Sequence, residues 1–177
     1  MDGNAYKDYV RGEADAWKTA TVKIEAEYEI PYEVHNPMEM HAITVKWEAD
    51  DKVTVYEKTQ FLAGTQGSIA AVFGIPPANV HVITKFVGGA FGSAGGTWPH
   101  SIAAAIAAKQ TGGPIKVSLT RDQMFTMVGY RPKAIQKISI GATSDGKLVG
   151  ITHEANAMTS SYAEFREGIT NTTRSLY

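Results

Sequence analysis

The sequence contains no cysteine. Disulfides, thiolate zinc sites, cysteine nucleophiles and cysteine-ligated iron–sulfur clusters are therefore excluded within these 177 residues. Long apolar runs are also missing, since the longest covers only residues 102–108 (IAAAIAA) and is too short to span a membrane. The first ten residues, MDGNAYKDYV, lack the apolar stretch of a secretory signal. We expect no membrane partner and no signal peptide.

A basic surplus is absent as well. Lys and Arg number 17 against 18 Asp and Glu, which gives a net charge of −1. Nucleic acid is therefore not an expected partner, because binding to a phosphate backbone favours clustered positive charge. Hydrophobic residues make up 44% and charged residues 20%, as in ordinary globular proteins. The length fits one domain or a large piece of one.

Apolar and polar residues alternate in several short segments, which indicates β-strands. In residues 22–29 one side carries Val22, Ile24 and Tyr28, so we expect a half-buried strand that ends at Pro31. Two hairpins are predicted: residues 43–48 with 53–57 across Asp50-Asp51-Lys52, and residues 135–140 with 148–153 across Asp145-Gly146. Further strands are expected over 80–86 and 115–119.

Three helices are predicted between these strands, at residues 66–73, 99–109 and 120–127. Gly74 suits the end of the first helix, and Thr120 with Gln123 has the spacing of a capping box at the start of the third. Hairpins mixed with crossover helices predict an α+β fold, with antiparallel or mixed sheets packed against two to three helices. Residues 1–20 are expected to form a lead-in segment with one helical turn, and no element is predicted over 158–177.

The segment VGGAFGSAGG at residues 87–96 carries five glycines between a predicted strand and a predicted helix. Glycine allows positive φ and close approach of a ligand to the main chain, and amides before a helix suit an anion. The segment is neither a Walker A loop nor a GxGxxG fingerprint. Its spacing alone leaves two interpretations open, a ligand-binding loop and a tight strand-to-helix turn.

Other polar residues are less specific. The five histidines are scattered, and none of their spacings is typical of a helical metal site. Gln60 ends a predicted strand, where its neutral amide can donate to an oxygen atom, although a lone glutamine often has no special role. Arg131 precedes Pro132 and could be held toward an oxyanion, or could simply be exposed.

Four segments taken together are more informative: HNPMEMHA at 35–42, KTQ at 58–60, VGGAFGSAGG at 87–96 and LTRDQMFTMVGYRP at 119–132. In order and spacing they resemble the molybdenum-binding subunit of the xanthine dehydrogenase/aldehyde oxidase family, and most of all the large subunits of bacterial periplasmic aldehyde oxidoreductases. The resemblance implies that residues 21–177 are part of the first molybdenum cofactor-binding domain.

The resemblance also implies roles for individual residues. Gln60 falls on the glutamine that lies near the molybdenum without being a direct ligand. Phe91 and its neighbours Gly88, Gly89 and Gly92 would supply backbone amides around the cofactor. No metal ligand and no catalytic residue is expected in this chain, because the general base and the substrate-orienting arginine of the family are expected beyond Tyr177. Arg131 is assigned no catalytic role.

One departure bears on the substrate. Purine-hydroxylating members of the family carry a carboxylate where this sequence has Gly95, which favours an aldehyde or another heterocycle. The implied function is that of a fragment of a molybdenum hydroxylase, which oxidises aldehydes or N-heterocycles to acids or hydroxylated products with oxygen from water. The alternative is a non-catalytic binding or assembly module that retains the fold.

The implied cofactor is molybdenum-molybdopterin in its cytosine dinucleotide form, held by the full enzyme and not by this chain alone. The implied partners are the remainder of the same subunit, an iron–sulfur subunit, a flavin subunit and a small aldehyde or heterocycle. The implied location is the bacterial cytoplasm or periplasm, and the isolated chain is expected to be inactive.

Overall fold

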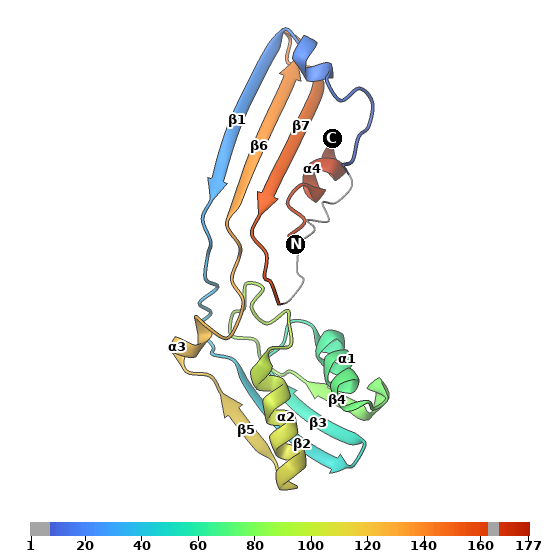
Figure 1. Ribbon diagram of the computed structural model, residues 1–177, viewed down its shortest axis with the longest axis vertical. Helices are drawn as coiled ribbons and strands as arrows, with labels where there is room; N and C mark the ends of the chain where they lie inside the picture. Colours follow the sequence, from blue (N-terminus) through green and yellow to red (C-terminus); the bar gives the residue numbers. More distant parts are fainter. Residues whose placement is uncertain (1–7, 163–166) are drawn as a thin grey trace. The chain divides into compact units, whose positions relative to one another are not determined.

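The computed structural model describes residues 8–162 and 167–177 (Figure 1). The first seven residues of the predicted lead-in lie outside the described part. The chain divides into two compact units. Unit 2 is the continuous segment Val34–Arg131, and unit 1 combines the segments on either side of it, up to Glu33 and from Pro132. Unit 2 is therefore inserted between two segments that fold together.

Unit 2 contains a four-stranded sheet with the order β4-β3-β2-β5. Its strands are β2 (Ala42–Ala49), β3 (Lys52–Glu57), β4 (Val80–Ile83) and β5 (Ile115–Ser118). Strand β2 pairs antiparallel with β3 and β5, whereas β3 pairs parallel with β4. The predicted hairpin across Asp50-Asp51-Lys52 is confirmed, and the sheet is mixed.

Helices α1 (Leu62–Phe73) and α2 (Pro99–Thr111) cover one face of this sheet. The alternating residues of the hairpin point into the core between the layers, and Val45, Val53 and Val55 are fully buried. Burying each such side chain stabilises the fold by about 1.5–3 kcal/mol. The small alanines of α2 let this helix approach the sheet closely, and the Trp47 indole donates to the carbonyl of Ala105 at 3.0 Å.

Three element boundaries in unit 2 differ from the sequence prediction by more than two residues. Helix α1 begins four residues early, with Phe61 at its N-cap position, and the Thr59 hydroxyl accepts from the Phe61 N–H at 3.0 Å. Strand β4 ends at Ile83 because its partner β3 ends at the same level. Helix α3 (Arg121–Met124) carries the predicted capping box and then continues as separate turns to Met127.

Unit 1 contains a three-stranded antiparallel sheet with the order β1-β6-β7. Its strands are β1 (Val22–Ile30), β6 (Ala134–Ala142) and β7 (Leu148–Ala157). The predicted hairpin across Asp145-Gly146 joins β6 to β7. A short helix α4 (Asn171–Leu176) follows, and the ring of His153 on β7 bonds Thr173 in it at 2.8 Å.

The burial predicted for β1 is wrong, although the strand lies where it was predicted. Val22, Ile24 and Tyr28 share one side, yet their exposed fractions are 44%, 60% and 53%. The 3-10 helix η1 (Ala16–Thr19) packs on the sheet over Gly141 and Gly150, which belong to β6 and β7. The alternating pattern therefore fixes the pleat of β1 without a covering layer on its apolar side.

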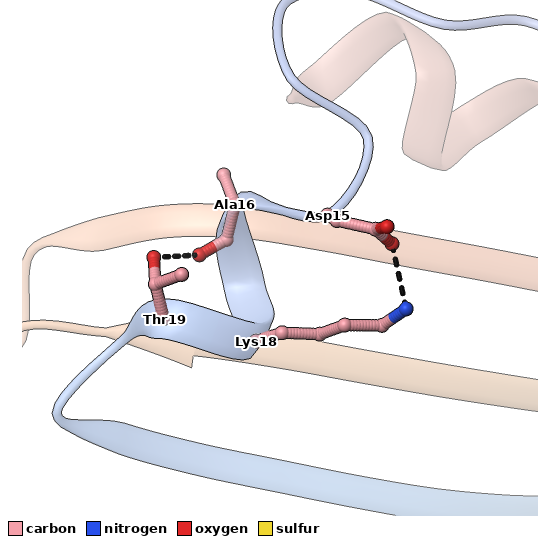
Figure 2. A network of polar contacts seen from close by, with 4 residues as sticks. All are labelled: Asp15, Ala16, Lys18 and Thr19. Atoms are coloured by element: carbon pink, nitrogen blue, oxygen red, sulfur yellow. Dashed lines mark hydrogen bonds and ion pairs between the residues drawn. The ribbon is translucent and has the colours of Figure 1, made fainter.

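Local polar contacts hold η1 (Figure 2). Lys18 forms an ion pair with Asp15 at 2.8 Å, and the Thr19 hydroxyl donates to the carbonyl of Ala16 at 2.9 Å. These contacts account for the single helical turn expected in the lead-in. No helix in the described residues is long and apolar enough to cross a membrane.

Candidate functional site

The side chain of Gln60 is bonded to the glycine loop, residues 87–96. Its Oε1 accepts from the N–H of Gly92 at 3.1 Å and of Ala94 at 3.3 Å. The backbone N–H of Gln60 donates to the carbonyl of Ala94 at 2.9 Å. Because the carbonyl end of the amide faces these donors, the NH₂ end is turned away from the loop. In the described part of the chain no acceptor bonds this NH₂, so it is a donor available to a ligand.

The tip of the loop is a tight turn from Ala90 to Ser93. Its two central residues, Phe91 and Gly92, have φ of +56° and +103°, as in a type I′ turn, and the N–H of Ser93 donates to the carbonyl of Ala90 at 3.0 Å. A positive φ is disfavoured for phenylalanine. The turn holds the Phe91 side chain outward, 69% exposed, and across residues 8–162 and 167–177 the N–H of Phe91 has no acceptor.

The first glycines of the loop are tied to the segment 35–42. The Glu39 carboxylate accepts from the N–H of Gly88 at 2.5 Å, and the N–H of Glu39 donates to the carbonyl of Gly88 at 3.0 Å. A Cβ on Gly88 would lie 2.8 Å from the Cβ of Glu39, so the close approach requires glycine. Gly89, with φ of +82°, turns the chain toward Phe91, and its N–H donates to the carbonyl of Val87 at 2.9 Å.

Two cationic side chains secure the same segment. The Arg121 guanidinium donates to Oδ1 of Asn36 at 2.8 Å, to the carbonyl of Pro37 at 2.7 Å and to that of Met38 at 2.9 Å. The ammonium of Lys58, a buried residue, donates to the carbonyl of Glu39. Burial lowers the pKa of Lys58 from its ordinary value, with the Arg121 charge as a further, smaller cause.

A layer of buried polar side chains lies in unit 2 around the loop. His41 Nε2 lies 3.2 Å from the Ser93 hydroxyl, which donates to the carbonyl of Ala90 at 2.9 Å. Ser101 donates to the carboxyl group of Glu57. The rings of His41 and His100 meet edge to face, with centroids 5.8 Å apart.

Burial shifts the pKa values of this layer. It lowers the pKa of His41 to about 4, with smaller contributions from the charges of Lys58, His100 and His35, and it also lowers the pKa of His100. Burial raises the pKa of Glu57, and the Ser101 hydrogen bond opposes that shift. Glu57 Oε2 and both ring nitrogens of His100 have no hydrogen-bond partner within the described residues. The histidines are therefore neutral at neutral pH.

The structure thus brings Gln60, Gly88, Gly89, Phe91 and Gly92 into one region of unit 2, although Gln60 is about thirty residues from the loop in sequence. The structure also reduces the number of backbone amides in this region that are available to a cofactor. The N–H groups of Gly88, Gly89 and Gly92 are bonded within the chain, so the N–H of Phe91 is the donor of this set that faces no acceptor in the described residues.

The contacts of several residues that build this region could not be predicted from the residues themselves. Arg121, Ser93 and Glu39 bond partners that are 49 to 85 positions away, and no periodicity links such positions. Only the shared family segments place them near the loop. Arg131 is exposed and is the last residue of unit 2.

A hollow of about 430 Å³ lies elsewhere, in unit 1, between η1 and the sheet. None of the predicted site residues lines it. Four carboxylates and two ammonium groups surround it: Asp15, Glu25, Glu27, Glu154, Lys18 and Lys137. The excess of negative charge does not suit a phosphate-bearing cofactor.

The hydrogen-bond donors near the glycine loop limit the kind of group that can bind in unit 2. No cluster of three or more metal-ligating side chains occurs in the described part of the chain. The amide of Gln60, the N–H of Phe91 and the exposed Phe91 ring suit a group that presents hydrogen-bond-accepting oxygen atoms. The residues therefore fit a cofactor approached by hydrogen-bond donors.

Comparisons with known proteins give a consistent result. A family model described as "Molybdopterin cofactor-binding domain" matches residues 1–176. The aldehyde oxidoreductase molybdenum-binding subunit PaoC of Escherichia coli K12 is 33% identical over 140 residues, which cover 79% of this chain and 19% of that protein. An indole-3-acetaldehyde oxidase of Zea mays is 35% identical over 148 residues, which cover 81% of this chain and 10% of that protein.

Among solved structures, the aldehyde oxidoreductase of Desulfovibrio gigas has a similar fold, with a TM-score of 0.75. It is 22% identical, and the match covers 82% of this chain and 16% of that one. At this identity the likeness supports the fold. The chain spans about a fifth or less of the length of these relatives.

Proposed function

This chain belongs to the molybdopterin cofactor-binding domain of the xanthine dehydrogenase/aldehyde oxidase family, and on that premise we propose that its glycine loop forms one wall of a molybdenum cofactor site. The observation that carries the proposal is the pair of hydrogen bonds from Gly92 and Ala94 to Gln60. These bonds fix which end of the Gln60 amide faces outward. The result is a neutral donor held against the loop beside an exposed aromatic ring.

In this proposal Gln60 donates from its NH₂ to an oxygen atom of the bound cofactor, and Phe91 donates from its backbone N–H. Both groups are neutral and already oriented, so they stabilise developing negative charge without reorganising. When bound, the molybdenum centre supplies the oxidation itself, the removal of two electrons as oxygen from water is added to the substrate carbon. The Phe91 ring and the nearby exposed Phe61 exclude water from the cofactor surface.

For the whole protein we propose the oxidation of aldehydes, with N-heterocycles as the second substrate class. An aldehyde and water give a carboxylic acid, two protons and two electrons, and the electrons pass to an iron–sulfur subunit and then to a flavin subunit. Gly95 leaves the loop without the carboxylate that grips purines in relatives, which supports the aldehyde. The proposed cofactor form is the cytosine dinucleotide, and the proposed location is the bacterial cytoplasm or periplasm.

The second candidate is a binding or assembly module without redox chemistry. One observation favours it: the N–H groups of Gly88, Gly89 and Gly92 already have acceptors in the chain, so few main-chain donors remain for a cofactor. The two candidates agree on the fold and differ on whether molybdenum binds.

The experiment compares this chain alone with the longer protein that contains it, both purified from a host that makes molybdenum cofactor. We expect stoichiometric molybdenum by elemental analysis and aldehyde oxidation with an artificial electron acceptor in the longer protein. The isolated chain should have neither, because one wall leaves most of the ligand in water. A longer protein without molybdenum would support the module, and turnover by the isolated chain would contradict the one-wall proposal.

A further inference from the structure

The turn from Ala90 to Ser93 needs support from outside the loop. Phe91 adopts φ of +56°, a conformation that costs a non-glycine residue roughly 1–2 kcal/mol. Such a conformation persists only when the surrounding contacts require it. Gln60 supplies one set of contacts from outside the loop, at Gly92 and Ala94. A second set comes from beneath the turn.

His41 and Ser93 form this second set, and their hydrogen bonds have a defined direction. The Ser93 hydroxyl has one proton, which it donates to the carbonyl of Ala90 at 2.9 Å. In its 3.2 Å contact with His41 Nε2 the hydroxyl must therefore accept, so His41 carries its proton on Nε2. The chain of donors runs from His41 to Ser93 to the first carbonyl of the turn.

His41 is itself held firmly, which makes it a suitable anchor. It is 1% exposed, and Ser93 is fully buried. The backbone N–H of His41 donates to the Met124 sulfur at 3.3 Å, and its carbonyl accepts from the N–H of Leu119 at 2.9 Å. The backbone of His41 is thereby linked on both sides to the segment 119–124, which lies outside the glycine loop.

We propose that His41 is a positioning residue of the cofactor site, which acts through the Ser93 hydroxyl to hold the turn Ala90–Ser93 and with it the N–H of Phe91. The structural half of this proposal, that His41 and Ser93 hold the turn, rests on the contacts above. The cofactor half, that the turn positions a donor for the cofactor, rests on the proposed function. His41 and Ser93 touch no ligand themselves. Their effect reaches the site because the turn they hold carries the donor and the aromatic ring.

Amide hydrogen exchange in the ¹⁵N-labelled 177-residue chain tests the structural half. The reporter is the amide of residue 93, and the core amide of Val55 reports on global stability. In Ser93→Ala and His41→Leu we expect exchange at residue 93 to rise by roughly fivefold or more, the effect of one lost hydrogen bond, with Val55 unchanged. His41→Gln retains a donor near the position of Nε2 and should stay within about twofold of the unmodified chain.

Ser101→Ala is the matched control. Ser101 is as buried as Ser93, but its hydroxyl bonds Glu57 instead of the loop, so exchange at residue 93 should not change. If His41→Leu fails to fold, Ser93→Ala carries the test. Unchanged amide exchange at residue 93 in Ser93→Ala overturns the proposal, as does an equal acceleration of exchange at Val55. Faster exchange at residue 93 in Ser101→Ala also overturns it. So does a His41→Gln variant that exchanges as fast as His41→Leu.

The cofactor half is tested in the longer, molybdenum-loaded protein. Ser93→Ala should lower kcat with little change in KM and in molybdenum content, because the cofactor stays bound while its donor is misplaced. If the exchange results are as expected but the longer protein holds no molybdenum, the proposed function fails and the cofactor half fails with it. If molybdenum is bound and exchange at residue 93 does not respond, the role of His41 alone is refuted.

Discussion

The side-chain oxygen of Gln60 lies 3.1 Å from the backbone nitrogen of Gly92 and accepts its hydrogen bond. The same oxygen accepts from Ala94, so one end of the Gln60 amide holds the loop while the other end stays available. The loop-holding and ligand-donating functions of this residue are therefore on different atoms. They can be separated by substitution.

Gln60→Glu keeps an acceptor for Gly92 and Ala94 but has no NH₂ donor, whereas Gln60→Ala removes both. We expect both variants of the molybdenum-loaded protein to lose turnover by about 10²-fold, the usual effect of removing one oriented donor. Only Gln60→Ala should speed amide exchange at Gly92 and Ala94. Full activity of Gln60→Glu, measured as kcat at saturating aldehyde, would show that the NH₂ is not used.

Gly92→Ala should destabilise the chain by about 2 kcal/mol, as measured by urea unfolding. At φ of +103° a Cβ is strained, and it would also lie 3.3 Å from Nε2 of His35. The matched control is Gly67→Ala in α1, where φ is not positive and no atom lies within 4 Å of the added Cβ. The control should gain about 0.5–1 kcal/mol from helix propensity. Similar effects of both substitutions would contradict the turn geometry.

Arg121→Ala should lower the free energy of unfolding by about 2–3 kcal/mol, because it leaves two main-chain carbonyls and Asn36 without a charged donor. Arg121→Lys should recover only part of this loss, since an ammonium cannot reproduce the fork of the guanidinium. Arg131→Ala serves as the control and should change stability by less than about 0.5 kcal/mol. A larger effect at Arg131 than at Arg121 would reverse the assignment of these two arginines.

Protonation of His41 should weaken the fold as the pH falls. Its pKa is lowered to about 4 in the folded chain against 6.5 when exposed, so the unfolded chain binds the proton first. The contribution of neutral His41 to the free energy of unfolding is fully present above about pH 6.5. This contribution falls by up to about 3 kcal/mol as the pH approaches 4. His41→Gln should flatten this limb in urea unfolding at pH 7, 5.5 and 4. His81→Gln, on an exposed side chain, should not.

The elements that were predicted well are those whose signals are local. The alternation in residues 43–57 predicts the central hairpin, and Thr120 with Gln123 predicts the cap of α3, because each signal lies within a few residues of what it describes. The start of α1 was missed because Phe61 occupies the cap position, where no polar side chain marks a helix. The exposure of Ile24 was missed because a period of two reports the pleat of a strand and not what covers it.

The candidate site divides in the same way. Gln60 and the glycine loop could be named because family segments mark them, but their hydrogen bond could not be derived from spacing. The support beneath the loop, from His41 to Ser93, joins positions 52 apart and depends on how β2 and the loop meet in three dimensions. Arg121 could not be preferred over Arg131 from sequence, since the acceptors of Arg121 lie at positions 36–38, more than eighty residues away.

The two ends of unit 2 meet. His35 and Gly129 lie close to its first and last residues, and the ring of His35 is bonded to the carbonyl of Gly129 at 3.0 Å. A segment that leaves and returns at one point can be grafted into another host protein without stretching either chain, as natural domain insertions are. Residues 34–131 are therefore suited to transfer as one segment, which would take Gln60 and the whole glycine loop with it.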